Sequence, residues 1–192
     1  MRLSPKLRRP FLRLVKTLET KLPEADGKHI RVRFRPNLHT YRGRVISRAA
    51  GQAIHAAADI RKRTIVLDSN LRAHPSELRR ILIHELFHFA WASLGNTTRK
   101  SWAQLIEAEW NRRARGELGW SSEYRKRALR PIPPEERDPR TWREYLCESF
   151  CDTAAWLYGD AGSHEEFTLA PRFANARAAW FRESFQSRKL SI

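Results

Sequence analysis

The sequence predicts an α+β domain, in which a small antiparallel or mixed sheet packs against one long helix and further helices follow. Two observations carry this prediction. The segment from His29 to Arg35 alternates apolar and charged side chains, which is typical of a half-exposed strand. The apolar run from Leu78 to Ala92 has helix start signals before it, at Pro75 and Ser76, and Gly95 after it.

The length and composition indicate one globular domain. The 192 residues suit a single domain over 1–192, and 41% apolar residues with seven tryptophans can form a core. Because no apolar stretch approaches a membrane span and the N-terminus lacks the apolar segment of a secretory signal, we expect an intracellular, cytoplasmic protein. Cys147 and Cys151, four residues apart, suit buried thiols better than an extracellular disulfide framework.

The first part of the chain is expected to contain one helix and three strands. Residues 1–28 are predicted to form an amphipathic helix with a basic outer face, followed by a turn; a transit peptide is the alternative. Besides the strand in 29–35, residues 38–47 predict a loop with a second strand and residues 64–67 a short buried strand. The small, Ala-rich residues 48–59 predict no element.

Three more helices are expected after the long one. They are predicted at about 98–115, from Asp138 to Tyr158, and at about 172–187. Asp138 can cap the middle helix, Pro139 fits its first turn and Gly159 ends it. Residues 116–138 are polar and rich in proline, and we expect them to form a long, mobile connection.

The positive charge is concentrated in the first half of the chain. The net charge is +16, of which residues 1–80 carry +14 and residues 81–192 carry +2. A basic half of this kind favours a polyanionic partner, most simply nucleic acid. The alternative is a generally basic proteome in which arginine replaces lysine on solvated faces.

The long helix contains the pentapeptide His84-Glu85-Leu86-Phe87-His88. Residues four apart lie on one face of a helix, so the two imidazoles can bind a single metal ion. Glu85 points slightly round the helix, where it can reach a water at the ion and act as a general base. The alternative is a pair of core histidines with an incidental acid, although an apolar helix rarely buries such groups without partners.

A catalytic zinc site needs a third protein ligand and an open position. No histidine occurs between His88 and His164, so the ligand must be a distant carboxylate or His164. Glu148 is the favoured carboxylate, because it and Asp152 lie four apart on one face of an otherwise small and apolar segment. Asp152 is then expected to accept the outer N–H of a ligand histidine. A solvated acidic face is the alternative.

Two short motifs and a longer segment carry a family resemblance. The His84–His88 motif followed by Glu148-x-x-x-Asp152 resembles the gluzincin clan of metallopeptidases. Residues 33–44, 65–67 and 78–88 resemble the SprT-like family, over about residues 29–102, and that family includes DNA-associated proteases. Asn96-Thr97-Thr98 lacks the histidine that is the third metal ligand in that family. This favours a glutamate from a later part of the chain as the third ligand. The resemblance implies a zincin-like fold and one Zn²⁺ per chain.

The function implied is a zinc-dependent metallopeptidase that acts on proteins or peptides, including DNA-associated proteins. Zinc held by His84, His88 and Glu148 is expected to activate a water, whose proton Glu85 takes and then passes to the leaving amine. Two alternatives remain open: a DNA-binding protein with a structural zinc site, and a zinc hydrolase of non-peptide substrates. The candidate donors to the oxyanion are Tyr158, His164 and Tyr145.

Overall fold

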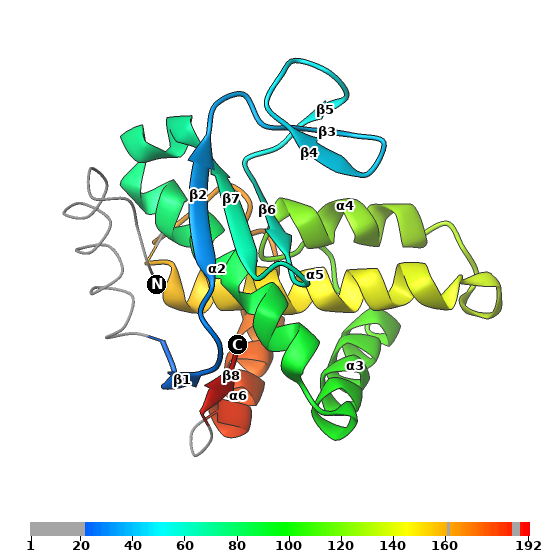
Figure 1. The fold of residues 1–192 in the computed structure, drawn as a ribbon. Helices are drawn as coiled ribbons and strands as arrows, with labels where there is room; N and C mark the ends of the chain where they lie inside the picture. Colours follow the sequence, from blue (N-terminus) through cyan, green and yellow to red (C-terminus); the bar gives the residue numbers. More distant parts are fainter. Residues whose placement is uncertain (1–21, 161, 186–188) are drawn as a thin grey trace.

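The chain folds as an α+β protein, which confirms the predicted class (Figure 1). The computed structural model describes residues 22–160, 162–185 and 189–192; most of the expected N-terminal helix lies outside them. The strands are β1 (Ala25–Asp26), β2 (Arg31–Arg35), β3 (His39–Tyr41), β4 (Arg44–Ile46), β5 (Gln52–Ala53), β6 (Ala56–Asp59), β7 (Thr64–Asp68) and β8 (Leu190–Ser191).

Five α-helices lie in the described part of the chain. None of them is both long enough and apolar enough to cross a membrane. They are α2 (Pro75–Ser93), α3 (Asn96–Asn111), α4 (Trp120–Leu129), α5 (Pro139–Tyr158) and α6 (Pro171–Phe185), with 3₁₀ turns η2 (Ser69–Ala73) and η3 (Pro134–Glu136).

The central sheet is mixed and has the strand order β2-β7-β6. β2 runs parallel to β7, with Val32 opposite Ile65, and β6 runs antiparallel to β7, with Ala57 opposite Val66. The predicted alternation of β2 is confirmed, because Val32 is buried while Arg31, Arg33 and Arg35 are exposed. The inner face of the sheet therefore packs on α2, and the outer face carries arginines.

A second, antiparallel sheet of order β4-β3-β5 stands above the first (Figure 1). The strand expected within residues 38–47 is therefore a hairpin, whose turn places Gly43 at φ 70°. Residues 48–59, for which the sequence predicted no element, contain β5 and β6. Their alanines give no alternation of polar and apolar side chains, so these strands are defined by their pairing, β5 with β3 and β6 with β7.

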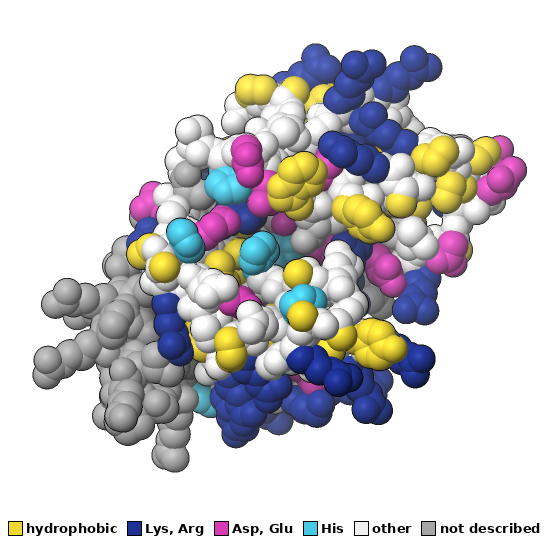
Figure 2. Space-filling model, turned by 90° about the horizontal axis from the view of Figure 1, so that it is seen from above, with side chains coloured by type: hydrophobic (Ala, Val, Ile, Leu, Met, Phe, Trp, Pro, Cys, Tyr) yellow, Lys and Arg dark blue, Asp and Glu magenta, His cyan; other side chains and the backbone are white. Residues whose placement is uncertain are grey.

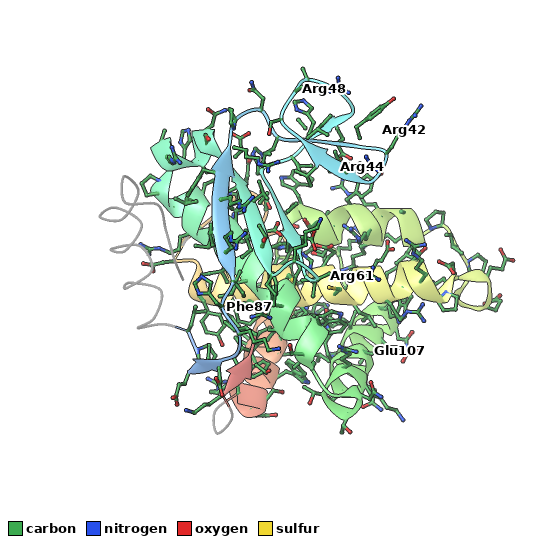
Figure 3. The ribbon with its side chains drawn as sticks, in the orientation of Figure 1. Arg42, Arg44, Arg48, Arg61, Phe87 and Glu107 are labelled. Carbon is green, nitrogen blue, oxygen red and sulfur yellow. The ribbon has the colours of Figure 1, made fainter. Side chains whose placement is uncertain are left out.

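Helices α2 and α5 lie side by side behind the central sheet (Figure 1). The predicted start signals of both are confirmed: α2 has Pro75 in its first turn, and Asp138 accepts a hydrogen bond from the Thr141 N–H at 2.9 Å to cap α5. Between them lies an aromatic core, in which the ring of Phe87, labelled in Figure 3, is 5.8 Å from Phe150 and 6.1 Å from Phe181. This packing fixes the α2 face that carries the histidines.

The segment 116–138 differs from its prediction, because it contains the helix α4 packed against α5. A mobile connection was expected because the segment is polar. The buried residues of α4 are Ser122, Lys126 and Leu129, so two of three are polar and no apolar stripe marks the helix in the sequence. Each buried polar group has a hydrogen-bonding partner, which allows the burial.

A buried cluster of charged groups joins α3, α4, α5 and α6. Arg177 lies 2.7 Å from Glu109 and 2.7 Å from Glu117, and Lys126 lies 2.7 Å from Glu117. The Tyr145 hydroxyl donates to the same Glu117 carboxylate at 2.6 Å. Charges can be buried in this way because each one is paired and hydrogen-bonded. The cluster holds the helices around α5 in place.

Candidate metal centre

Helices α2 and α5 bring three side chains together: His84, His88 and Glu148. The His84 Nε2 atom is 3.2 Å from His88 Nε2 and 3.2 Å from Glu148 Oε2, and His88 Nε2 is 3.9 Å from that oxygen. One donor atom from each residue therefore lies within 4.8 Å of the others, close enough to bind one ion.

Asp152 determines which ring nitrogen of His84 faces the position between His84, His88 and Glu148 where an ion can bind. Its Oδ1 lies 2.7 Å from His84 Nδ1, and its Oδ2 accepts from the backbone N–H and the hydroxyl of Ser122 at 2.8 and 2.7 Å. An ionised carboxylate can only accept, so Nδ1 of His84 carries the hydrogen. Nε2 of His84 then faces Glu148 Oε2 at 3.2 Å. A contact this close requires positive charge between the two atoms, which either a proton on Nε2 or a bound metal ion supplies.

The charges of the centre support this requirement. Burial raises the pKa of Glu148, but His84, His88 and Arg125 outweigh it and bring the pKa to about 2. Burial lowers the pKa of His84, but Asp152 and Glu148 outweigh it, and the pKa lies well above its usual value. The surroundings of the two residues therefore favour a positive charge between them.

The spacing of the donor atoms fits a tetrahedral ion. Ligands about 2.0 Å from zinc at tetrahedral angles are separated by about 3.3 Å. The three observed separations of 3.2, 3.2 and 3.9 Å are close to this value. Two imidazole nitrogens and one carboxylate oxygen are also a common donor set of catalytic zinc. The other Glu148 oxygen lies 3.1 Å from Arg125, which leaves one oxygen for the ion.

Glu85 lies beside this centre and lines a cavity of about 590 Å³ together with His84. Glu85 is buried, with 7% of the residue exposed. Burial raises its pKa, which the neighbouring histidines partly offset. Residues 54–56, which lead into β6, form one wall of the cavity, and the start of α4 forms another through Trp120. Figure 2 shows histidine and acidic side chains gathered around the middle of this face.

The three candidate oxyanion donors lie in different places. His164 lines the cavity, with its Nε2 3.4 Å from Glu77. The Tyr145 hydroxyl donates to Glu117 in the buried charge cluster. The Tyr158 ring stacks on Phe87, 5.7 Å away, in the aromatic core, where burial raises its pKa to about 12. Both tyrosine side chains are therefore engaged outside the cavity, and His164 is the one of the three that we retain as a candidate oxyanion donor.

The remaining alternative for the third ligand was His164. It belongs to a separate group with Glu77 and Glu166, and Arg80 forms ion pairs with both of these carboxylates. Glu148 is therefore the expected ligand that the structure places beside His84 and His88.

Comparison of the chain with family models, curated proteins and solved structures gave no match in any of the three. The chemistry of the centre is therefore inferred from its own geometry.

Sequence reasoning missed three residues around the centre: Ser122, Arg125 and Cys147. Ser122 and Arg125 lie on α4, which the sequence did not predict, and they contact Asp152 and Glu148. Cys147 precedes Glu148 on α5, and its sulfur is 3.4 Å from His88 Nδ1. A hydrogen bond from Cys151 and the nearby His88 lower the pKa of Cys147 to about 6. The sequence signal that could have identified Cys147 is its position directly before Glu148.

A basic groove of about 1100 Å³ lies on the outer face of the central sheet. We call it the arginine groove. Arg44, labelled on the hairpin in Figure 3, lies above the sheet, and Arg61 lies at the lower end of β6. Lys and Arg side chains also gather along the lower edge of the view in Figure 2. Five arginines line the arginine groove: Arg31, Arg33, Arg35, Arg44 and Arg61. Within the described part of the chain, none of them forms an ion pair with a carboxylate.

Proposed function

We propose that this chain is a zinc-dependent metallopeptidase of zincin-like design. The observation that carries the proposal is the convergence of His84, His88 and Glu148 beside a cavity that His84 and Glu85 line. Three protein ligands with an accessible fourth side are typical of catalytic zinc, whereas structural zinc sites have four protein ligands.

The chain's own residues supply the rest of the chemistry. His84, His88 and Glu148 would hold the zinc, which when bound acts as a Lewis acid and lowers the pKa of water. Glu85 accepts the proton of the attacking water and returns it to the leaving amine. Asp152 keeps His84 in the tautomer that presents Nε2 to the centre.

The arrangement of the sheet supports a peptide as substrate. β6 is an edge strand of the central sheet, and its first residue, with Ile54 and His55 before it, lines the catalytic cavity. An extended peptide can pair with such an edge through backbone hydrogen bonds. This gives a peptide a binding mode that a small non-peptide substrate lacks.

The experiment is a zinc analysis combined with a casein cleavage assay. The purified protein should contain about one zinc per chain, as a three-ligand site implies, and should cleave casein. Glu85→Gln should retain zinc and the fold but lose cleavage, because it removes a base and not a ligand. His84→Ala and His88→Ala should lose the zinc.

Three results would count against the proposal. Full zinc retention by both histidine variants would show that the metal binds at another site. Loss of zinc from Glu85→Gln would show that Glu85 is not only a general base. Cleavage of small amides or esters with no cleavage of casein would favour the non-peptide hydrolase.

We also propose that the arginine groove binds the backbone of a nucleic acid. Five arginines without a carboxylate partner among the described residues line one groove, and its acidic residue, Asp59, is paired with Lys62 at 3.0 Å. β6 lies between this groove and the catalytic cavity, since Ala57 lines the first and Ala56 the second. A protein bound to the same nucleic acid would thus be held near Glu85.

Salt dependence tests this second proposal. Replacing Arg31, Arg33 and Arg35 by Gln should weaken binding to duplex DNA and lower the slope of log affinity against log salt, by about 0.9 for each phosphate that is no longer neutralised. The matched control replaces three arginines elsewhere: Arg112, Arg113 and Arg115. Equal effects of the two sets, or no binding at low salt, would contradict the proposal. The basic residues Arg8, Arg9 and Arg13, also expected to contribute, lie outside the described residues.

A further inference from the structure

The two ligand histidines differ in the group that faces their outer ring nitrogen. His84 Nδ1 faces a carboxylate oxygen of Asp152 at 2.7 Å, whereas His88 Nδ1 faces the sulfur of Cys147 at 3.4 Å. Metal-binding histidines usually donate this N–H to a carboxylate, a backbone carbonyl or water. A cysteine sulfur in that position is unusual, and the mechanism proposed above gives it no role.

We propose that Cys147 is a positioning residue of the metal centre, whose sulfur accepts a hydrogen bond from the Nδ1–H of His88. This proposal rests on the proposed function, because it concerns how a ligand of that centre is oriented. With the hydrogen on Nδ1, the Nε2 lone pair of His88 faces His84 and Glu148. The opposite tautomer would place a hydrogen at Nε2, in the position that the ion requires.

The local geometry favours the sulfur as acceptor. Cys147 immediately precedes Glu148, so one turn of α5 supplies both a ligand and the group that orients another ligand. Cys151 lies one turn further and is fully buried, with its sulfur within 4.8 Å of the Cys147 sulfur. If the thiol of Cys151 donates to Cys147, the sulfur of Cys147 is left as an acceptor for two hydrogens, one from Cys151 and one from His88.

The same residues could also form a metal group of their own, because His88, Cys147 and Cys151 have donor atoms within 4.8 Å. That group would use His88 Nδ1, which faces away from Glu148. It contains the fully buried Cys151, and none of its three residues lines the cavity that Glu85 lines, whereas His84 of the other group does. The geometry therefore favours the orienting role, and the experiment below separates the two.

The experiment measures zinc affinity by competition with a chelator in Cys147→Ala, Cys147→Ser and Cys151→Ala. Cys147→Ala should lower the affinity about 10–100-fold, the range usual for groups that orient a ligand. Cys147→Ser should restore most of it, because a hydroxyl oxygen also accepts the Nδ1–H. Cys151→Ala, which leaves the sulfur that accepts the Nδ1–H in place, should lower the affinity by less than Cys147→Ala. Glu144→Ala, at an exposed position of the same helix, is the control and should leave the affinity unchanged.

A second readout reports the hydrogen bond itself. In the zinc-loaded wild type, nuclear magnetic resonance of the imidazole nitrogens should show His88 with its hydrogen on Nδ1 and with that hydrogen protected from exchange. Cys147→Ser should retain this protection and Cys147→Ala should lose it. A cysteine that only filled space would leave the protection unchanged.

Several outcomes would overturn the proposal. Unchanged affinity in Cys147→Ala would exclude it, and so would equal losses in all three variants, which would indicate disturbed helix packing. Zinc retained by Glu148→Ala but lost by Cys147→Ala would assign the ion to the cysteine group. If the wild-type protein binds no zinc, the proposed function is wrong, whatever the cysteine variants do. Failure of the proposed function is therefore distinguishable from failure of the proposed role of Cys147.

Discussion

At the scale of single residues, the tautomer of His84 determines what the centre can bind. Asp152 is 2% exposed and uses one oxygen for His84 and the other for Ser122. This leaves His84 Nε2 facing a carboxylate oxygen at 3.2 Å. A metal ion can replace the proton at this nitrogen only while Asp152 keeps the ring in this orientation, so metal affinity should depend on Asp152 as well as on the ligands.

The order of two substitutions tests this view. Glu148→Ala leaves two histidines, so zinc affinity should collapse. Asp152→Ala keeps all three ligands and should lower zinc affinity about 10–100-fold. Glu144→Ala, on the same helix but exposed and paired with Arg140, is the control and should leave zinc affinity unchanged. Equal, small effects of all three would indicate a solvated acidic face.

Residue spacing predicted part of the centre. The i, i+4 spacing of His84 and His88, and of Glu148 and Asp152, depends only on helix geometry and can be read from the sequence. The spacing cannot show which helices meet, and so the contacts of Arg125 and Cys147 were not predicted. The roles of His84, His88 and Glu148 as zinc ligands stay predictions until the metal is measured.

At the scale of elements, α4 supports the centre from outside. Ser122 contacts Asp152 and Arg125 contacts Glu148, so two residues of one helix hold two acids of α5. The close approach depends on Gly119, because a Cβ there would lie 2.3–2.6 Å from the carboxyl atoms of Asp152. The position of α4 and the geometry of the centre are therefore linked.

Gly119→Ala tests this link. The added methyl group should displace the Asp152 carboxylate and lower zinc affinity to a similar extent as Asp152→Ala. In the double variant the two effects should not add, because both act through the same contact. Gly95→Ala is the control, since a Cβ there meets no atom within 4 Å, and its zinc affinity should be unchanged. Normal affinity in Gly119→Ala would show that Asp152 does not orient His84.

The elements that the sequence predicted correctly have local signals. α2 and α5 have start signals and apolar runs, and β2 alternates clearly. α4 was missed because its buried face is mostly polar, and β6 because its side chains are small. The stability of such elements comes from tertiary contacts, which a single sequence does not display.

At the scale of the whole molecule, the buried charge cluster couples stability to pH. Burial raises the pKa of Glu117, but Arg177 and Lys126 outweigh it and bring the pKa to about 2, below the usual 4.5. Ionised Glu117 therefore stabilises the fold at pH above about 4.5, and this contribution is lost as the pH falls toward about 2. Its size, from the pKa difference, is about 3 kcal/mol.

Glu117→Gln should reveal this contribution in urea unfolding. The free energy of unfolding should be lower than that of the wild type near neutral pH, and the difference should shrink as the pH falls below about 4.5. Glu144→Gln, at an exposed position, should differ little from the wild type at any pH. A difference for Glu117→Gln that stays constant down to about pH 3 would show that the ionisation of Glu117 does not stabilise the fold.

Two exposed aromatic residues give the position of α4 a further meaning. Trp120, at the wall of the cavity, is 54% exposed, and Tyr124, one turn further along, is 75% exposed. The same helix contacts Glu148 through Arg125 and Asp152 through Ser122. A ligand of these two aromatic rings that binds differently to the metal-free and metal-loaded forms must change the metal affinity. By thermodynamic reciprocity, the metal then changes the affinity of that ligand by the same factor. A molecule bound at these two rings would therefore report on the loading of the centre through the contacts that α4 makes with Glu148 and Asp152.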